Sequence, residues 1–150
     1  MPDANDTLGA DRAAILATDL RALISRLKRR LLEQADVGDL TPSQIAALLR
    51  LEREGPMTTS ALARAEGVRS QSMGATLTPL QAAGHVTGAP DPADGRQTLL
   101  SLSASCRAWI AAGRAARQDW LTRAIARELS AEEQAQLAEA LVLLKRVAGA

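Results

Sequence analysis

The chain has 150 residues, a formal net charge of +1 and one cysteine. This length suits one domain, or one lobe with an added dimerisation part, and it is long enough to bury a sizeable core. A lone cysteine excludes an intramolecular disulfide. A near-neutral charge does not by itself indicate a nucleic-acid partner. No apolar run approaches the roughly 20 residues of a membrane span and no signal peptide is visible, so we expect a cytoplasmic protein.

Aromatic side chains are scarce, since the chain has two tryptophans and neither Tyr nor Phe. Proteins that bind single-stranded nucleic acid stack the bases on aromatic rings. The composition therefore disfavours that class of protein.

Apolar residues at three- and four-residue steps predict a long amphipathic helix over residues 7–34. The apolar stripe is sustained along the whole helix, as in a helix that packs on another helix. Its members are Ile15, Leu16, Leu20, Leu23, Ile24, Leu27 and Leu31.

The segment "LTPSQIAALLRLEREG" predicts a second helix with clear ends. Thr41 is a good N-cap, Pro42 suits the first helical position and Gln44 completes a capping box. Gly55 is expected to end this helix in the left-handed conformation.

Two shorter helices follow in "MTTSALARAEGV" and "SQSMGATLTPLQAAG". Ser70 is the expected N-cap of the second, and Met73, Leu77 and Leu80 form its expected inward face. Pro79 predicts a kink or a broken turn there, because a proline inside a helix removes a hydrogen bond at a cost of roughly 3 kcal/mol. Two short helices joined by a glycine-containing turn indicate a helix-turn-helix, although any small helical hairpin has the same pattern.

The segments "HVTG" and "QTLLSL" predict the two strands of a β-hairpin. Val86 is the expected core residue of the first strand, and Leu100 and Leu102 share one face of the second. The connecting loop, "APDPADGR", is longer than a minimal hairpin needs, which is typical of a functional or disordered loop.

Two long helices complete the predicted elements. Ser103 is the expected cap of the first of them, which carries Trp109 and Trp120. Ser130 and Glu133 form a second capping box, which starts the final amphipathic helix.

The order of elements predicts a mainly α (α+β) fold with a winged helix-turn-helix core. We expect a flanking helix at 7–39, a winged-helix lobe at 40–102 and further flanking helices at 103–150. The flanking helices have more apolar surface than so small a lobe can cover, so they form either a dimer interface or an intramolecular three-helix core. The residues expected at the dimer interface are Leu16, Leu20, Leu23, Leu27, Leu137, Leu141 and Leu144.

Nearly the whole chain, from about Leu16 to Val147, resembles the MarR family, named for multiple antibiotic resistance. The motifs that carry the resemblance are "LTPSQIAALLRLEREGPMTTSALARAEGVRSQSMGATLTPLQAAGHV", "DPADGRQTLLSLS", "RAARQDWL" and "LSAEEQAQLAEALVLL". The resemblance implies a homodimeric transcription regulator, usually a repressor, that binds a pseudo-palindromic operator in double-stranded DNA.

The resemblance implies that the helix from Ser70 is the recognition helix and lies in the major groove. There a Gln can pair with adenine, Ser and Thr can bond bases or phosphates, an Ala can touch a thymine methyl, and an Arg can bind a phosphate or a guanine. The residues expected to contact DNA from this segment are Arg69, Ser70, Gln71, Ser72, Ala75 and Thr76.

The resemblance also implies that Arg96, at the tip of the hairpin loop, reaches into the minor groove and that Asp94 orients it. A narrow A·T-rich minor groove attracts a guanidinium through its enhanced negative potential. From the loop alone, a solvated arginine paired with Asp94 or Asp91 is the simpler interpretation. The preceding "TGAP" lacks the basic residues that family members often carry there, so we expect weaker binding by this wing.

A small effector is a further implication of the resemblance. Family members commonly release DNA when a small, often aromatic or phenolic compound binds between the winged helix and the dimerisation helices. Trp109 lies near that junction, and Arg107 and Arg114 are the expected partners of an anionic compound. Trp120 is expected to pack in the helical core.

The sequence contains no catalytic constellation and no phosphate-binding glycine loop, so we expect no enzyme activity. With His85 as the one histidine, expected at the surface, and no Cys-x-x-Cys pair, we expect no metal or other cofactor. Two alternatives remain open. One is a helical scaffold protein that kept the fold but lost DNA binding. The other is a redox switch through Cys106, whose pKa the helix N-terminus and Arg107 would lower, although a buried structural cysteine is the simpler interpretation.

Overall fold

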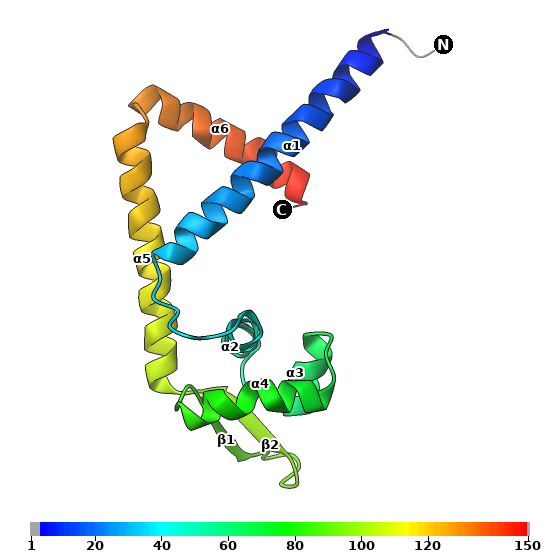
Figure 1. The fold of residues 1–150 in the computed structure, drawn as a ribbon, viewed down its shortest axis with the longest axis vertical. Coiled ribbons are helices and arrows are strands. Elements are labelled where there is room, and N and C mark those ends of the chain that lie inside the picture. Colours follow the sequence, from blue (N-terminus) through cyan, green and yellow to red (C-terminus); the bar gives the residue numbers. More distant parts are fainter. Residues whose placement is uncertain (1–3, 150) are drawn as a thin grey trace. The chain divides into compact units, whose positions relative to one another are not determined.

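The computed structural model of the chain describes residues 4–149, with side chains from residue 9 onward. The described part contains helices and one two-stranded antiparallel sheet, which confirms the mainly α prediction (Figure 1). It divides into two compact units: the winged-helix unit, Val37–Arg114, and the helical unit, which comprises the chain up to Asp36 and from Ala115 onward. The elements are α1 (Ala4–Glu33), α2 (Pro42–Glu54), α3 (Thr59–Ala65), α4 (Ser70–Ala82), β1 (Val86–Pro90), β2 (Thr98–Leu102), α5 (Ala104–Glu128) and α6 (Ala131–Ala148).

Local capping fixes the start of α2 as the sequence predicts. The Thr41 side chain accepts a hydrogen bond from the Gln44 backbone N–H at 3.2 Å, and the Gln44 side chain accepts one from the Thr41 N–H at 2.8 Å. These bonds satisfy two backbone donors that a helix start otherwise leaves unpaired. The helix ends at Gly55, whose φ of +84° and ψ of −164° require glycine but are not the left-handed helical geometry that we expected.

The start of α4 differs from the expectation. Ser70 is the first helical residue and not its cap, because Arg69 takes the cap position with an extended backbone and makes no side-chain capping bond. Extended φ and ψ suffice to start a helix, and a capping side chain adds stability without being obligatory.

Pro79 does not break α4, which runs without interruption from Ser70 to Ala82, so the broken turn that we considered is wrong. Residue 79 still has no N–H to donate. The cost is offset because the buried Leu77 and Leu80 anchor the helix on both sides of Pro79, whose own ring is exposed. Beyond the proline the backbone pairing resumes, with the Ala83 N–H donating to the Pro79 carbonyl at 2.9 Å.

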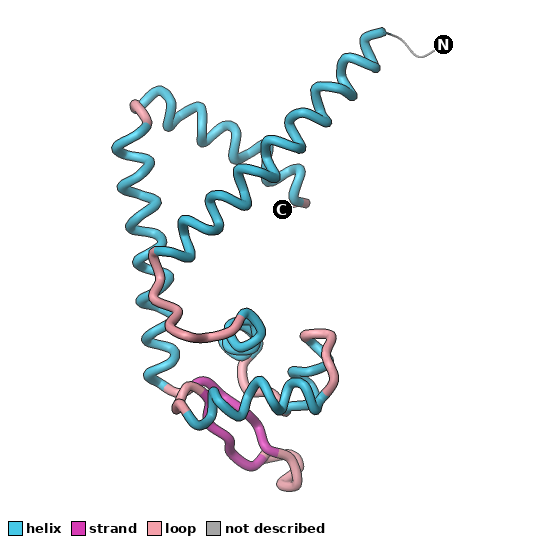
Figure 2. The backbone as a smooth tube through the Cα atoms, in the orientation of Figure 1, coloured by secondary structure: helices cyan, strands magenta, loops and turns pink. Residues whose placement is uncertain are grey.

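The β-hairpin forms a wing that is tied to the helix-turn-helix. Val86 pairs with Leu102 and Pro90 with Thr98, so β1 extends beyond the predicted "HVTG" and the loop is shortened to 91–97 (Figure 2). On its other side, Leu100 exchanges two backbone hydrogen bonds with Met57, at 2.8 and 3.1 Å, just before α3. The wing is therefore fixed to the start of the helix-turn-helix by backbone bonds.

The core of the winged-helix unit is apolar and joins every element of that unit. Val86, Leu100 and Leu102 are buried, as the alternating strand pattern predicts. No buried polar or charged side chain is found among the described residues. The buried cluster consists of Ala47, Leu48, Leu51, Leu62, Ala63, Met73, Leu77, Leu80, Val86, Leu100, Leu102, Cys106 and Ile110.

The helical unit contrasts with this, because its apolar side chains stay exposed. A second capping box starts α6, where Ser130 and Glu133 exchange bonds of 2.8 and 3.2 Å as predicted. None of the side chains of α6 is buried, and Leu23 of α1 is 58% exposed. The described helices of this unit therefore do not form the intramolecular core that we considered. Among the described residues of this unit, the one ring contact is between Trp120 and Arg30, whose guanidinium lies 5.7 Å from the centre of the Trp120 ring.

No helix in residues 4–149 combines the length and the apolar character that crossing a bilayer requires.

Candidate nucleic-acid interface

The packing of α4 decides which of its side chains face solvent. Met73, Leu77 and Leu80 are buried and mark the inward side. At 3.6 residues per turn, the opposite side is occupied by residues 71, 75, 78 and 82, with residue 79 beside them. All five are exposed. This outward face of α4 consists of Gln71, Ala75, Thr78, Pro79 and Ala82.

The outward face contains two of the residues expected from the sequence, Gln71 and Ala75. Arg69 and Ser70 are also exposed, at the N-terminal end of the helix. Thr78 was missed by sequence reasoning, although it lies seven residues after Gln71, which is two helical turns, and the spacing alone could have identified it.

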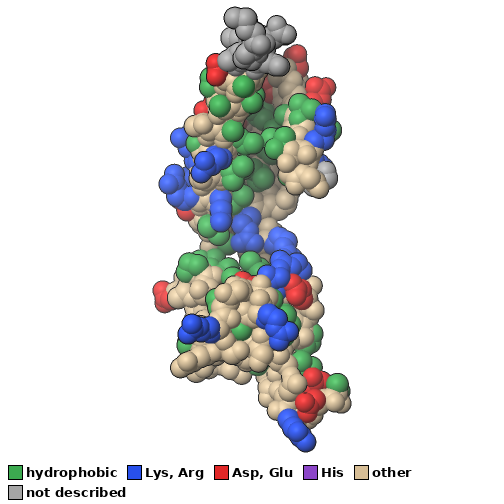
Figure 3. All heavy atoms as spheres, turned by 90° about the vertical axis from the view of Figure 1, so that its right-hand side faces the viewer, with side chains coloured by type: hydrophobic (Ala, Val, Ile, Leu, Met, Phe, Trp, Pro, Cys, Tyr) green, Lys and Arg blue, Asp and Glu red, His purple; other side chains and the backbone are tan. Residues whose placement is uncertain are grey.

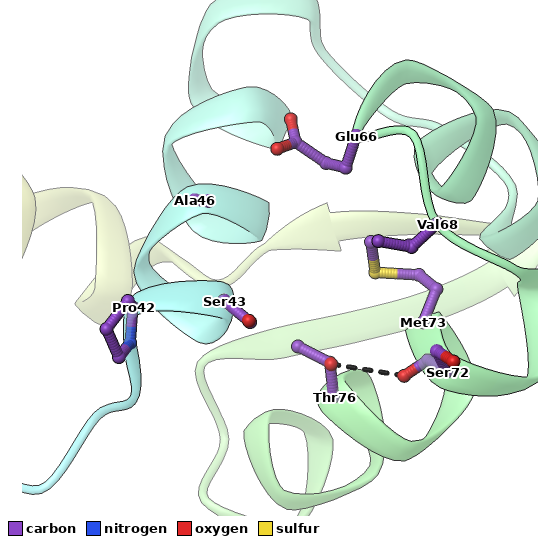
Figure 4. A pocket seen from close by; sticks show the side chains of 8 residues that line it. All are labelled: Pro42, Ser43, Ala46, Glu66, Val68, Ser72, Met73 and Thr76. Carbon is purple, nitrogen blue, oxygen red and sulfur yellow. Dashed lines mark hydrogen bonds between the residues drawn. The ribbon is translucent and has the colours of Figure 1, made fainter.

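Ser72 and Thr76 lie instead on the flank of α4 that faces α2. Both line a pocket of about 330 Å³ together with Ser43 of α2 (Figure 4). The half-buried Thr76 donates its hydroxyl to the Ser72 carbonyl at 3.1 Å. The structure therefore separates these two predicted contact residues from the outward face.

The Asp94 side chain holds the wing loop by hydrogen bonds to its neighbours in the loop. Its carboxylate accepts a hydrogen bond from the Arg96 backbone N–H at 3.1 Å and one from the Gln97 side chain at 3.4 Å. Asp91 makes a similar bond to the Ala93 N–H at 2.9 Å. These Asx-type bonds stabilise a tight turn without using the arginine head group.

The Arg96 guanidinium is exposed and makes no ion pair within the part of the chain that the structure describes. The simpler interpretation was a solvated arginine paired with Asp94 or Asp91. The arginine is solvated, but the ion pair with Asp94 or Asp91 is absent from the described residues, so that part of the interpretation is wrong. In Figure 3 the protruding tip of the winged-helix unit carries basic and acidic side chains together, while most of the neighbouring surface in view is uncharged.

Arg50 of α2 positions the helix-turn-helix, and sequence reasoning missed it. Its guanidinium bonds Glu66 at 2.6 Å, Glu54 at 2.5 Å and the Ala65 carbonyl at 3.3 Å. The bond with Glu54 raises the pKa of Arg50 above its usual value and holds the pKa of Glu54 below its own. Arg50 therefore links α2 to the end of α3, directly before the turn into α4.

A hollow of about 410 Å³ lies between the start of α3 and the wing. Its lining is polar and includes one exposed cation, Arg64, which was also missed from the sequence. The remaining lining residues are Thr58, Thr59, Ser60, Gln97 and Thr98.

The residues expected at an effector site already have protein partners. Trp109 is half-buried against the core, with its ring 5.9 Å from that of His85, which is half-buried and not at the surface as expected. Arg107 donates to the Leu102 carbonyl at 2.9 Å, and Arg114 pairs with Glu52 at 2.8 Å. An anionic compound at Arg114 would have to compete with Glu52.

Among residues 4–149, no cluster of histidine, cysteine and acidic side chains has the arrangement of a metal site.

Comparison with known proteins connects this geometry to a family. A MarR family model matches residues 38–97, which span the helix-turn-helix and the wing loop. A Mycobacterium bovis protein named as the uncharacterized HTH-type transcriptional regulator Mb0904 is 42% identical over 116 residues, covering 77% of this chain and 81% of that protein. The chain belongs to the MarR family. It is therefore a helix-turn-helix transcriptional regulator of a DNA-binding family and not an enzyme.

Two solved structures extend the similarity of this MarR protein beyond the matched segment. A putative transcriptional regulator from Pseudomonas aeruginosa is 35% identical and superposes with a TM-score of 0.76 over 98% of both chains. A MepR mutant from Staphylococcus aureus, bound to an oligodeoxyribonucleotide, covers 87% of this chain and 96% of its own with a TM-score of 0.72. At 19% identity, the MepR match shows the shared fold alone.

Cys106 does not have the lowered pKa that a redox switch requires. It is fully buried, and burial raises the pKa of its thiol. Arg107 lowers this pKa and Glu52 raises it further, but the net direction is upward. This is opposite to the redox-switch alternative and agrees with the simpler interpretation, a buried structural cysteine. The reason is that α5 turns Cys106 into the apolar core, where desolvation outweighs the nearby guanidinium.

We predict that Cys106 resists iodoacetamide in the native protein at pH 8 and reacts after unfolding in guanidinium chloride. The pKa of the Cys106 thiol is higher in the folded protein than in the unfolded chain, where it is near 8.5. The thiol therefore contributes to the free energy of unfolding below about pH 8.5, and this contribution is lost progressively as the pH rises above that value. Mass spectrometry of the alkylated chain measures the reaction. Rapid modification of the native protein would contradict the assignment.

Proposed function

We propose that this protein is a homodimeric repressor that binds a pseudo-palindromic operator in double-stranded DNA. The observation that carries the proposal is the exposed Arg96 side chain, which makes no ion pair and stands on a wing loop held by the Asp94 carboxylate. The wing lies beside a helix-turn-helix, and the outward face of its second helix is exposed to solvent. The DNA-bound MepR neighbour supports a DNA partner through its shared fold.

In this proposal, α4 lies in the major groove, which is wide enough to admit a helix. Its outward face contacts the base edges. The exposed Arg69 and Arg64 contact phosphates on either side of the helix-turn-helix, since a guanidinium matches phosphate geometry. Ser72 and Thr76 contact the sugar–phosphate backbone of the DNA at the edge of the groove.

The wing supplies the minor-groove contact in this proposal. The Asx-type bonds of Asp91 and Asp94 keep the loop rigid, so Arg96 loses little backbone entropy when it binds. The loop projects one guanidinium and no second basic residue, which suits insertion at a single narrow A·T-rich position.

The homodimer is proposed from the exposed apolar side chains of the helical unit. Leaving so many large apolar groups in water is unfavourable, at roughly 25 cal/mol per Å² of apolar surface. A second copy offers the same faces and buries them by symmetry. The expected interface residues Leu16, Leu23, Leu27, Leu141 and Leu144 are all exposed, while Leu20 and Leu137 are half-buried.

A small aromatic or anionic effector is the remaining part of the proposal. Such a compound would act by binding one arrangement of the dimer more tightly than another. Trp109 is the expected aromatic contact. Arg107 and Arg114 could join it only by giving up their present acceptors, the Leu102 carbonyl and Glu52.

The test of the proposed function is a gel-shift assay of the full chain on the DNA upstream of its own gene. We expect specific binding, with half-sites about 10 bp apart and a logarithm of affinity that falls linearly with the logarithm of salt concentration. Equal binding to unrelated DNA would contradict the proposal and favour a scaffold that retains only the fold.

Arg96→Ala is expected to weaken operator binding by about 1–3 kcal/mol, because it removes the only basic group at the tip of the wing. The effect should be largest for operators with A·T-rich flanks. Arg127→Ala is the control, since Arg127 is also an exposed arginine but lies at the end of α5 in the helical unit, where it pairs with Glu128. If both variants bind alike, with unchanged circular dichroism, the wing has no role.

Leu23→Glu is expected to convert the dimer into monomers, because it places a charge in the middle of the proposed interface. Sedimentation at micromolar concentration measures the change. Leu49→Glu is the control, because Leu49 is an exposed leucine of the winged-helix unit, 39% exposed. A wild-type chain that sediments as a monomer would rule out the homodimer.

A further inference from the structure

The outward face of α4 has an unusual chemistry for a surface that contacts DNA. No residue from Ser70 to Ala82 carries a charge. The face has two side chains with hydrogen-bonding groups, the Gln71 amide and the Thr78 hydroxyl, and is otherwise formed by the methyl groups of Ala75 and Ala82 and by the Pro79 ring.

The Thr78 hydroxyl is engaged with the backbone of its own helix. The hydroxyl donates to the Gly74 carbonyl at 2.9 Å, one turn earlier in the helix. This bond fixes the side chain against its own backbone and occupies the hydroxyl hydrogen. The side chain therefore contributes mainly apolar surface to the outward face.

The other hydroxyls of α4 lie away from this face. Ser72 and Thr76 line the pocket toward α2, and the Thr76 hydroxyl is bonded to the Ser72 carbonyl (Figure 4). Ser70 lies at the start of the helix, next to Arg69. These polar groups reach the margin of a groove, where the phosphates are, more readily than its floor.

Base pairs differ in what they require from such a surface. Guanine presents two acceptors in the major groove, which arginine or lysine satisfies, and cytosine presents an amino group, which a carboxylate accepts. Neither kind of side chain occurs between Ser70 and Ala82. Adenine presents an acceptor and a donor that match a Gln amide, and thymine presents a methyl group that matches apolar side chains.

We propose that α4 selects A·T base pairs, with Gln71 binding adenine and with Ala75, Thr78 and Pro79 contacting the methyl groups of thymines. The proposal rests on the proposed function, in which α4 lies in the major groove. It adds the base class and assigns it to the outward face. A G·C pair under this face would lose hydrogen bonds to water, and beyond the single Gln71 amide nothing on the face replaces them, which disfavours such a pair.

Arg69 stands outside this assignment. It precedes the first helical residue, is exposed and makes no capping bond. We assign it to a phosphate, so Arg69→Ala should weaken binding to all sequences alike and reduce the salt dependence by about one phosphate contact.

The first experiment selects binding sites for the full chain from a pool of randomised double-stranded DNA. We expect enriched half-sites with A·T pairs at consecutive positions in the major groove under α4. Enrichment of half-sites with G·C pairs at those positions overturns the inference while leaving the proposed function intact. A pool that shows no enrichment contradicts the proposed function as well.

The second experiment changes single atoms of the selected operator. Deoxyuridine in place of thymidine removes only the base methyl, and 7-deazaadenine in place of adenine removes only the N7 acceptor. We expect about tenfold weaker binding for 7-deazaadenine at one position of each half-site and a smaller loss, about threefold, for deoxyuridine at its neighbours. Binding that is insensitive to both replacements overturns the inference.

Matched variants assign each effect to its side chain. Gln71→Ala should bind adenine and 7-deazaadenine operators equally, whereas Gln81→Ala, which changes an exposed glutamine outside the outward face, should still discriminate. Thr78→Ser removes the methyl and keeps the hydroxyl, so it should lose the response to deoxyuridine at one position. Thr76→Ser, whose hydroxyl makes the same kind of backbone bond, should retain that response.

If Gln71→Ala keeps its sensitivity to 7-deazaadenine, or if Thr76→Ser behaves like Thr78→Ser, the assignment to the outward face is wrong. Circular dichroism and thermal unfolding of each variant show whether the fold is preserved. The serine pair keeps the two variants comparable, because each loses one methyl group from the same helix.

Discussion

Met73, Leu77 and Leu80 attach α4 to the winged-helix core along one side, and this burial determines what the opposite side offers to a partner. All three side chains are essentially inaccessible to solvent. Burial of a side chain of this size stabilises the fold by roughly 1.5–3 kcal/mol. Rotation of α4 about its axis would turn Thr78 or Gln71 toward the core in place of these apolar side chains. The orientation of the helix about its axis is therefore fixed. The same anchoring allows a proline within the helix, because packing on both sides of Pro79 offsets the missing hydrogen bond.

The positions of α4 and of the wing are coupled through two further links. Arg50 bonds the end of α3 and thereby sets the turn into α4. Met57 and Leu100 join the start of α3 to β2 by backbone bonds, which do not depend on side-chain rotamers. The outward face of α4 and the Arg96 loop therefore belong to one rigid lobe. A lobe of this kind can match the spacing of two neighbouring grooves without ordering itself on binding, which reduces the entropic cost of association.

The parts of the fold that were predicted from sequence are those decided by neighbouring residues. The capping boxes at Thr41 and Ser130 depend on a side chain three residues away, and the burial of Leu100 and Leu102 follows from strand alternation. The parts that could not be predicted depend on contacts between distant segments. Arg50 and Glu66 are 16 residues apart, and Arg114 and Glu52 are 62 apart. Burial of Cys106 likewise depends on which side of α5 meets the core, which no local pattern reveals.

The errors at the candidate interface have a different origin, because the helical spacing from the predicted inward face already separates these side chains. Ser72 and Thr76 were expected to contact DNA, but the helical positions of the buried residues place them toward α2. Thr78 has the same chemistry as Thr76 and lies on the outward face. Residue type alone therefore could not distinguish the two threonines, whereas the position of the inward side of the helix does so at once.

The near-neutral charge of the chain and the uncharged outward face of α4 have the same consequence, which is a low non-specific affinity for DNA. Non-specific affinity for DNA is supplied almost entirely by contacts with phosphates, so a chain whose 18 basic residues are balanced by 17 acidic ones binds random DNA weakly. Contacts with thymine methyls and with adenine add affinity only where the sequence matches. Since the useful quantity is the ratio of specific to non-specific binding, a regulator with a weakly basic surface can discriminate well at modest total affinity. Two linked copies would then recover the affinity that each lobe lacks, because the second lobe binds as an intramolecular event. The exposed apolar faces of the helical unit provide the surface that such a linkage requires.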